Sequence, residues 1–228
     1  PGLLQKYQYR ALVISTGACA IHCRYCFRRD FPYQEQQATR SRWESTIAEI
    51  KSDVTLEEVI LSGGDPLMLS NDRLREIFKD LDAISHVERI RIHTRMPIVL
   101  PERIDEGLIE LIEKSTSRVI VVIHSNHPNE LDSSVALAME RLSHTGATLL
   151  NQSVLLRNIN DSDSTLIALS KKLFGMKVIP YYLHLLDPAT GTAHFDVGLE
   201  QSRDLANRLR AALPGYLVPK LVQEVPGR

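Results

Sequence analysis

Apolar segments rich in β-branched residues alternate with amphipathic segments along most of this 228-residue chain. The clearest apolar segment is Arg118–His124, whose run VIVVI suits a strand covered on both faces. Strands are predicted at Ala11–Thr16, Glu58–Ser62, Arg89–His93, Arg118–His124, Thr148–Leu156 and Lys177–Leu186, with a last extended segment at Leu217–Val225. Helices are predicted at Ser41–Lys51, through Leu81 after a cap at Asn71 or Asp72, and at Pro101–Lys114, Ser133–His144, Ser162–Phe174 and Gly198–Ala212.

This order gives six strand–helix units, which predicts an α/β fold with a parallel sheet and right-handed crossovers. A closed barrel of eight units usually needs about 250 residues. Six units therefore predict an incomplete (β/α)6 TIM-like barrel, in a single domain that spans residues 1–228. A flat, doubly wound sheet is the alternative, because hydrophobic periodicity alone does not separate the two. Gly146 and Gly175 follow two of the helices and are predicted to close them.

Polar residues suited to chemistry gather where the predicted strands end. The cysteines follow the first strand, SGGDP (62–66) the second, HTRMP (93–97) the third and HSNHPNE (124–130) the fourth. In parallel α/β folds the active site lies at the carboxyl ends of the strands. The pattern therefore favours an enzyme with a large pocket that binds several ligands.

Charge and composition argue against several other classes of function. Lys plus Arg is 27 and Asp plus Glu is 28, and the formal net charge of -1 argues against bulk nucleic-acid binding and against a basic membrane-binding face. The longest apolar run, Val119–Ile123, is too short to span a bilayer. Nothing near Pro1 resembles a signal peptide, and the chain is expected to be a fragment of a longer protein.

All three cysteines, Cys19, Cys23 and Cys26, fall within eight residues. An odd number so closely spaced is not a disulfide framework, so a reducing, cytoplasmic setting and a metal or cluster role are predicted. Structural zinc takes four ligands, and His22 is poorly placed as the fourth because it adjoins Cys23. An iron–sulfur cluster also usually takes four cysteines, and three leave one iron open to a non-protein ligand. A zinc knuckle and three buried thiols are the alternatives.

The spacing C-x3-C-x2-C resembles that of the radical S-adenosylmethionine (SAM) superfamily, and Ser62-Gly63-Gly64-Asp65 is similar to its glycine-rich loop. The resemblance implies a [4Fe–4S] cluster whose open iron binds SAM, and reductive cleavage of SAM to a 5′-deoxyadenosyl radical. It also implies that the loop contacts the methionyl amine of SAM, since bare glycines permit a close approach. Taken alone, this loop is equally well explained as a tight turn.

Longer strings resemble the lysine 2,3-aminomutase family over nearly the whole chain. They are GACAIHCRYCFRRDFPY, LSGGDPL, HTRMPIVLPERI, HSNHPNE, NQSVLLRNIND, PYYLHLLDPATGTAHF and GYLVPKLV. PGLLQKY and YLHLLD are most similar to the branch that makes (R)-β-lysine for elongation factor P. The resemblance implies a barrel of the radical SAM type that converts L-lysine to β-lysine, with pyridoxal phosphate (PLP) supporting the migration of the amino group from Cα to Cβ. Expected partners are L-lysine, an electron donor such as flavodoxin or ferredoxin, and a second copy of the chain in a homo-oligomer.

Three charged residues match family positions that hold the substrate. Arg28 matches the arginine that holds the substrate carboxylate, which a planar guanidinium pairs at two points. A solvated surface arginine is the alternative. Asp161 and Asp187 match two aspartates that hold the lysine side-chain ammonium. The alternatives are a helix cap for Asp161 and a turn before Pro188 for Asp187.

Other residues match positions in the cofactor pocket. Lys6, Tyr7 and Arg10 match positions that line the PLP phosphate, with an exposed basic N-terminus as the alternative. Polar groups within or after apolar strands must find partners, either in a ligand or in the core. Five such residues are further candidates for the cofactor pocket: Thr94, His124, Asn126, Asn151 and Gln152.

The chain departs from the family at its C-terminal end. None of its eight lysines matches the family's PLP-binding lysine, which lies beyond a proline–glycine stretch such as the one in VQEVPGR (222–228). We expect that lysine in a continuation of the chain. Two rival functions remain: the same chemistry on another amino acid such as glutamate, which the carboxylates of Asp161 and Asp187 argue against, and a non-catalytic iron–sulfur or zinc module.

Overall fold

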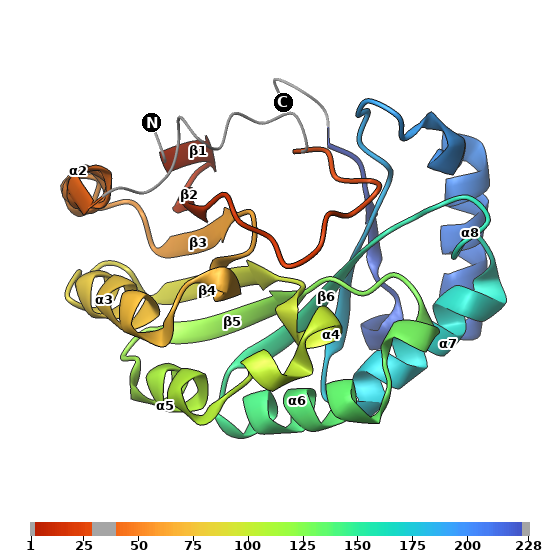
Figure 1. Ribbon diagram of the computed structural model, residues 1–228. Helices are drawn as coiled ribbons and strands as arrows, with labels where there is room; N and C mark the ends of the chain where they lie inside the picture. Colours follow the sequence, from red (N-terminus) through yellow and green to blue (C-terminus); the bar gives the residue numbers. More distant parts are fainter. Residues whose placement is uncertain (1–2, 29–39, 225–228) are drawn as a thin grey trace.

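A computed structural model of the chain describes residues 3–28 and 40–224, apart from the side chains of residues 6, 7, 40 and 41. These residues form one sheet of eight strands that follow chain order (Figure 1). The strands are β1 (Leu3–Tyr7), β2 (Arg10–Thr16), β3 (Glu58–Gly63), β4 (Arg89–Thr94), β5 (Arg118–Ile123), β6 (Thr148–Val154), β7 (Ile179–His184) and β8 (Lys220–Val222).

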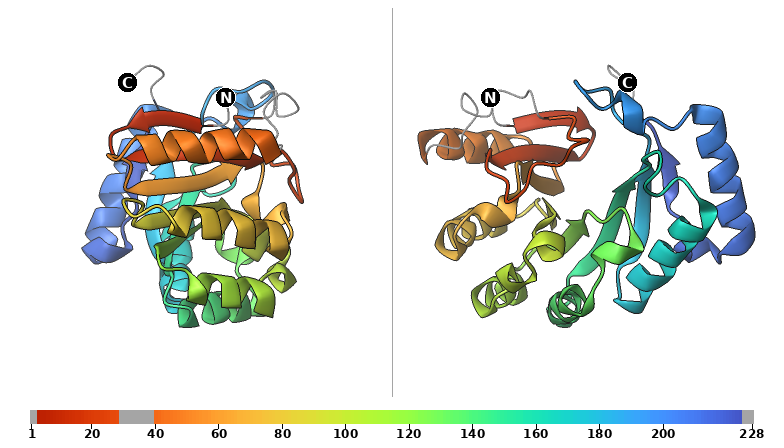
Figure 2. Two further views of the ribbon diagram at one scale, coloured as in Figure 1. Left: turned by 90° about the vertical axis from the view of Figure 1, so that its left-hand side faces the viewer. Right: turned by 45° about the vertical axis from the view of Figure 1, so that its right-hand side comes forward.

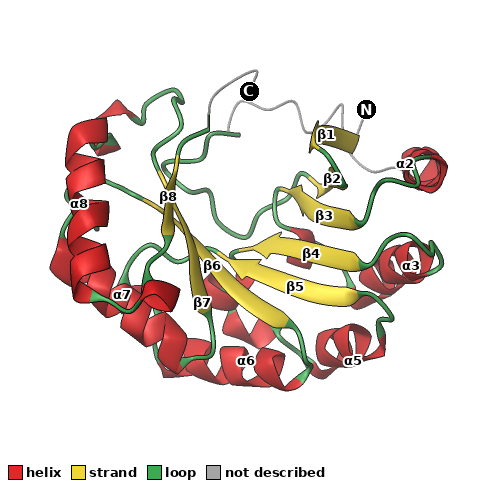
Figure 3. Cartoon of the chain, turned by 180° about the vertical axis from the view of Figure 1, so that it is seen from behind, coloured by secondary structure: helices red, strands yellow, loops and turns green. Residues whose placement is uncertain are grey.

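The sheet curves into an open barrel. Strands β2 to β8 run parallel, and each lies beside the next in the chain. Right-handed crossovers then place all the connecting helices on one face, whereas a doubly wound sheet reverses its strand order midway. Figure 3 shows the helices outside the curved row of strands, and Figure 2 shows β1 and β8 at opposite ends of an open crescent. The predicted incomplete barrel is confirmed, and the flat sheet is not found.

The helices and the outer face of the sheet enclose the main hydrophobic core. Val13, Ile92 and Val121 point outward from their strands and belong to one buried cluster with Trp43 and Leu74 of the helices. Burying such side chains contributes roughly 1.5–3 kcal/mol each. The helices are α2 (Arg40–Ser52), α3 (Asn71–Asp82), α4 (Met96–Val99), α5 (Glu106–Lys114), α6 (Ser133–His144), α7 (Asp163–Gly175) and α8 (Leu199–Ala212).

The inner face of the sheet carries charged and polar side chains. Successive strand residues point to opposite faces. Ile90 and Ile92 face outward to the core, so Arg91 and His93, which alternate with them, point inward. Arg91 forms an ion pair with Glu58 of β3, with 2.5 Å between Nη2 and Oε1. The barrel therefore buries its apolar side chains against the helices and keeps charged groups inside the curve.

Two helix starts differ from the prediction because aspartate and serine side chains cap them. The helix predicted from Pro101 begins only at Glu106, where the Asp105 carboxylate accepts a hydrogen bond of 2.8 Å from the Leu108 amide. Pro101–Arg103 forms a separate 3-10 turn. Ser70, rather than Asn71 or Asp72, caps α3 through a 3.3 Å bond from the Arg73 amide.

The predicted closing glycines have mixed outcomes. Gly146 has a φ of +81°, the left-handed conformation that ends a helix, as predicted. Gly175 is instead the last residue of α7, and Lys177 takes the positive φ of +61°. As a result β7 begins at Ile179 and not at Lys177. No helix in residues 3–28 and 40–224 is long and apolar enough to cross a membrane.

Candidate active site

The cysteine loop after β2 lies directly against the glycine loop after β3. The Gly64 amide donates to the Thr16 carbonyl at 2.7 Å, and the Asp65 amide donates to the Ala18 carbonyl at 2.8 Å. A Cβ added at Gly64 would lie 2.2 Å from the Ala18 oxygen, and one at Gly63 would lie 2.3 Å from the Thr16 oxygen. Glycine is therefore required at both positions for the two loops to meet.

The three cysteines are half-buried and close to one another. Burial, together with nearby Asp65, Cys26 and Cys23, raises the pKa of the Cys19 thiol to about 11. The Cys26 amide donates to the Cys23 carbonyl at 3.1 Å, which turns the loop between them. In the described part of the chain, no three His, Cys, Asp or Glu side chains stand close enough to hold one metal ion.

This donor set fits a cluster better than a single ion. A [4Fe–4S] cluster takes thiolate ligands on separate irons, so its cysteines need not converge on one point. Three thiols on one loop match such a ligand set, and the glycine loop beside them leaves no side chain in the way. Bound iron would also lower the thiol pKa that burial raises.

Arg28, two residues after Cys26, contacts the glycine loop. Its Nη1 donates to the Ser62 hydroxyl at 3.0 Å and lies 3.5 Å from the Gly63 carbonyl. The guanidinium is half-buried rather than a solvated surface group. The structure thus brings Arg28, Ser62 and Gly63 together beside the cysteine loop.

Asp65 and Thr94 hold the loops in position. The Asp65 carboxylate accepts bonds from the Thr94 hydroxyl at 2.7 Å, from the Arg95 amide at 2.7 Å and from the Leu67 amide at 3.0 Å. Burial raises the pKa of Asp65, and these hydrogen bonds oppose the rise. The Thr94 hydroxyl also accepts from the Met96 amide at 3.0 Å. Both side chains connect β3 to β4 inside the protein.

His124 and Gln152 form a pair on the inner face at the ends of β5 and β6. Their Nε2 atoms lie 2.9 Å apart. Burial, together with the charge of nearby Arg95 and the neighbouring His184 and Arg28, lowers the pKa of His124 to about 3. Burial and the neighbouring histidines and arginines lower the pKa of His93 well below its usual range. Both imidazoles are therefore neutral at pH 7 and can accept hydrogen bonds.

Asn151 and Asn126 tie β5, β6 and their following loops together. Asn151 accepts from the Ser125 amide at 2.9 Å and donates to the Ser153 hydroxyl at 2.9 Å. Asn126 accepts from the Val154 amide at 2.8 Å and donates to the Tyr25 hydroxyl at 2.7 Å. Asn151 therefore packs within the core, whereas Asn126 reaches the cysteine loop.

The remaining candidates lie at the two ends of the barrel. Asp161 and Asp187 follow the neighbouring strands β6 and β7, and Asp161 Oδ1 accepts from the Asn158 amide at 2.9 Å. The backbone of Tyr7 pairs with Arg10 in an antiparallel hairpin, at the opposite end of β2 from the cysteines. That hairpin includes a strand, β1, that sequence patterning did not predict. The side chains of Lys6 and Tyr7 lie outside the described part of the chain.

A network around Arg95 was not predicted. Its guanidinium donates to Cys23 Sγ at 3.3 Å and to the Tyr25 hydroxyl, and it pairs with Glu130 Oε2 at 2.9 Å. Its Nε is buried and finds no hydrogen-bond partner among residues 3–28 and 40–224. The HTRMP string contains Arg95, but nothing local indicates that it reaches back 72 residues to a cysteine.

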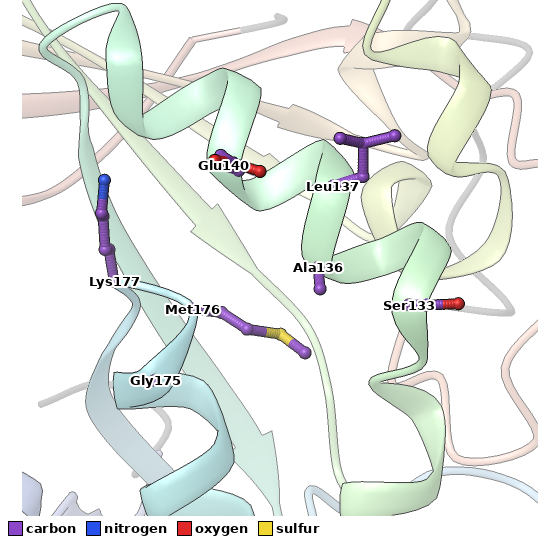
Figure 4. Close-up of a pocket in the computed structure, with 7 residues that line it drawn as sticks. All are labelled: Ser133, Ala136, Leu137, Glu140, Gly175, Met176 and Lys177. Atoms are coloured by element: carbon purple, nitrogen blue, oxygen red, sulfur yellow. The ribbon is translucent and has the colours of Figure 1, made fainter.

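A groove of about 550 Å³ lies on the outer surface, away from these residues. It runs between α6 and the turn from α7 to β7 (Figure 4). Its lining residues are Ser133, Ala136, Leu137, Glu140, Gly175, Met176 and Lys177. None of the predicted site residues lines it, so the groove is separate from the candidate active site.

Comparison with known proteins identifies the family of this chain. The sequence profile of the Radical SAM superfamily matches residues 13–135. The chain is 48% identical over 227 residues to L-lysine 2,3-aminomutase of Escherichia coli, covering all of this chain and 66% of that protein. It is 44% identical to the Haemophilus influenzae protein of the same name, of which it covers 67%. The Clostridium subterminale L-lysine 2,3-aminomutase is 37% identical, with 55% covered.

Solved structures agree on the fold. Streptococcus suis SuiB, bound to precursor peptide SuiA, superposes with a TM-score of 0.70 at 15% identity, covering 96% of this chain and 49% of that one. A radical SAM methyltransferase from Sphaerobacter thermophilus gives 0.61 at 18% identity, covering 97% and 68%. These similarities show the fold alone. The profile match and the full-chain identity to the aminomutases establish that the chain belongs to the lysine 2,3-aminomutase family of the radical SAM superfamily.

Proposed function

We propose that this chain is the core of an L-lysine 2,3-aminomutase that converts L-α-lysine to β-lysine. The observation that carries the proposal is the 48% identity that extends over the whole chain to a protein of that name. The meeting of the cysteine and glycine loops at the carboxyl end of β2 and β3 supports it. Because the chain spans about two thirds of the length of that relative, the rest of such an enzyme would lie outside these 228 residues.

Cys19, Cys23 and Cys26 would hold a [4Fe–4S] cluster with one iron left for SAM. The loop Ser62-Gly63-Gly64 would then contact SAM, because its glycines already permit another chain segment to approach closely. Asp65, Thr94 and Asn151 would serve this site by fixing its shape, since their polar atoms bond to neighbouring loops.

The two ends of the substrate would meet opposite charges. Arg28, held at Ser62, would pair with the substrate carboxylate beside the cluster. Asp161 and Asp187, at the ends of β6 and β7, would hold the lysine side-chain ammonium. Asp161 already bonds to the Asn158 amide, so only part of its carboxylate is offered to the ammonium.

PLP would occupy the inner face of the barrel. His124, Gln152 and Asn126 would line this pocket near the carboxyl ends of β5 and β6. The assignment of Lys6, Tyr7 and Arg10 to the PLP phosphate rests on the sequence resemblance alone, because Tyr7 and Arg10 pair at the opposite end of β2. His124 would enter this pocket uncharged, because burial depresses its pKa to about 3. When bound, the three cofactors supply the radical chemistry and the support for the migrating amino group.

The residues of the chain would bind the substrate and orient it. Arg28 and the two aspartates would fix the substrate at both ends, so that its Cβ faces one direction only. The neutral pair His124–Gln152 would present hydrogen-bonding groups without adding a charge to the interior. A flavodoxin or ferredoxin would deliver the electron, and the product would serve the modification of elongation factor P.

The test uses the full-length enzyme, reconstituted with iron and sulfide without oxygen. It is incubated with SAM, PLP, a strong reductant and single L-amino acids, and the products are separated by chiral derivatisation and mass spectrometry. We expect β-lysine from L-lysine and no product from glutamate. Another β-amino acid would overturn the choice of substrate but keep the chemistry.

A complete absence of β-amino acid would overturn the aminomutase proposal. Release of 5′-deoxyadenosine in that case would indicate a radical enzyme with a different substrate. Absence of both products, together with a loaded cluster, would favour a non-catalytic iron–sulfur module.

A further inference from the structure

Arg95 connects the cysteine loop to Glu130 in the segment that follows β5. It follows β4, and its side chain is only 19% exposed. One guanidinium nitrogen, Nη1, donates both to Cys23 Sγ, at 3.3 Å, and to the Tyr25 hydroxyl. The other, Nη2, pairs with Glu130 Oε2 at 2.9 Å. A single planar guanidinium therefore holds two residues of the cysteine loop and one carboxylate of the barrel rim.

The contacts of Arg95 close into a ring. Glu130 Oε1 accepts a 2.9 Å bond from the Asn126 amide, and the Asn126 side chain donates to the Tyr25 hydroxyl at 2.7 Å. Asn126 is itself fixed by the Val154 amide of β6. The Arg95 side chain is thus held on both sides, so its distance from Cys23 is set by the fold rather than by a mobile surface side chain.

We propose that Arg95 is a positioning residue that tunes the cluster as well as fixing its loop. This inference rests on the proposed function, because it takes Cys23 as a cluster ligand. Reduction adds one negative charge to a cluster, and a hydrogen bond from a cation to a ligating sulfur stabilises the more negative form. The guanidinium of Arg95 therefore raises the reduction potential and eases electron entry before SAM cleavage.

The contact is specific to one of the three sulfurs. In the described part of the chain, Cys23 is the cysteine whose sulfur has a hydrogen bond to a charged side chain. The ring also brings Tyr25, which lies between Cys23 and Cys26, under the same guanidinium. Removing the guanidinium should therefore change the electronic state of the cluster while all three ligands remain.

The test compares Arg95→Gln and Arg95→Lys with the wild type in the full-length, reconstituted enzyme. Iron and sulfide content are measured first, and the potential is then followed by redox titration with electron paramagnetic resonance, without SAM or PLP. We expect Arg95→Gln to keep its cluster but to show a roughly tenfold lower ratio of reduced to oxidised cluster at a fixed potential. That ratio corresponds to a shift of about 59 mV for one electron.

Arg103→Gln is the matched control. Arg103 is also mostly buried, and its guanidinium bonds to the Leu67 and Leu69 carbonyls at 2.8 and 3.0 Å. It tests the loss of a buried arginine without a contact to the cysteine loop, and its potential should equal that of the wild type. Arg95→Lys keeps the positive charge but lacks the planar guanidinium with its several N–H donors. The reduction potential of its cluster should therefore lie between those of the wild type and Arg95→Gln.

Unchanged potential in a fully loaded Arg95→Gln protein would overturn the inference. If Arg95→Gln does not retain iron, Arg95→Lys decides: a potential equal to that of the wild type overturns the inference, and a lower one supports it. A wild-type protein that binds no iron would instead refute the proposed function itself. The two failures are therefore distinguishable.

Discussion

At the scale of single residues, the candidate site depends on a glycine that lacks a Cβ and on an aspartate whose carboxylate is hydrogen-bonded. Gly64 is needed because the Ala18 carbonyl occupies the space where any Cβ would stand. Asp65 is needed because it accepts from one hydroxyl and two amides at the join of β3 and β4. Both residues therefore shape the loops that would receive the cofactors.

Gly64→Ala should displace the cysteine loop. Its Cβ would meet the Ala18 oxygen at 2.2 Å, so the Ala18 backbone must move. We expect iron loading to fall and SAM to bind at least tenfold more weakly, as measured by iron analysis and equilibrium binding in the full-length enzyme. Gly198→Ala is the control, because an added Cβ there meets no atom within 4 Å. Equal SAM affinity in both variants would contradict the proposed packing.

Asp187→Asn should weaken the binding of lysine. Losing one charge from a hydrogen bond to an ammonium costs about 1.5–3 kcal/mol, which is roughly a 10- to 100-fold rise in KM for lysine. Release of 5′-deoxyadenosine should continue slowly, no longer coupled to β-lysine. The control is Asp196→Asn, an exposed carboxylate near α8. Unchanged lysine kinetics in Asp187→Asn would remove this residue from the ammonium site.

At the scale of elements, local caps decide where helices begin. Asp105 caps α5 and also accepts from the Asn71 side chain at 2.8 Å, so it connects α5 to α3. Periodicity predicts that this helix exists, but it extends the helix back to Pro101. The 3-10 turn and the cap are defined by local hydrogen bonds, which the spacing of apolar residues does not predict.

Asp105→Ala should destabilise the fold without changing the site. Loss of an N-cap costs about 1 kcal/mol, and loss of the bond to Asn71 adds to it. Urea unfolding should therefore give a free energy lower by about 1–2 kcal/mol, with cluster content unchanged. Glu102→Ala, an exposed residue of the preceding turn, should leave the free energy within about 0.5 kcal/mol. An equal effect of the two variants would argue against the cap.

At the scale of the whole molecule, the barrel separates apolar and polar strand residues. Val13, Ile92 and Val121 lie outside the sheet against the helices, and Arg91 and His93 of β4 point inside the curve. His93 of β4 and His124 at the end of β5 come within 6.1 Å, centroid to centroid, although 31 residues separate them. The interior thus holds these two imidazoles in their uncharged form.

Stability should fall as the pH drops below about 6.5. The unfolded pKa of histidine is about 6.5 and that of folded His124 is about 3, so the unfolded chain binds more protons between these values. The contribution of His124 to the free energy of unfolding is fully present above pH 6.5 and decreases as the pH falls towards 3. At pH 5 the free energy of unfolding is lower by about 2 kcal/mol because of His124, and the lowered pKa of His93 acts in the same direction.

The measurement is thermal or urea unfolding of the full-length protein from pH 4 to 8. His124→Gln keeps an amide beside Gln152 and removes the titrating group, so its stability should depend less steeply on pH between 4 and 6.5. His144→Gln, at the end of α6, is the control. Parallel pH curves for the wild type and His124→Gln would refute the role of the buried imidazole.

The sequence alone determines the alternation of strands and helices and the loop that carries the three cysteines, whereas the choice of the open barrel over a flat sheet comes from the strand order. These features are local: strand and helix periods extend over a few residues, and the cysteines lie within eight. The contact of Arg28 with Ser62 of the glycine loop comes from the structure. The antiparallel strand β1 escaped prediction because its pairing with β2 depends on a hairpin rather than on an apolar repeat.

Only the tertiary structure decides which polar groups meet. Arg95 and Cys23 lie 72 residues apart, and Asn126 and Tyr25 lie 101 apart, yet they share one hydrogen-bonded ring. Partner choice at this distance follows from strand order and register, which bring the ends of β2, β4 and β5 to one rim. Side-chain hydrogen bonds act over about 3 Å, so no local pattern in the sequence encodes them.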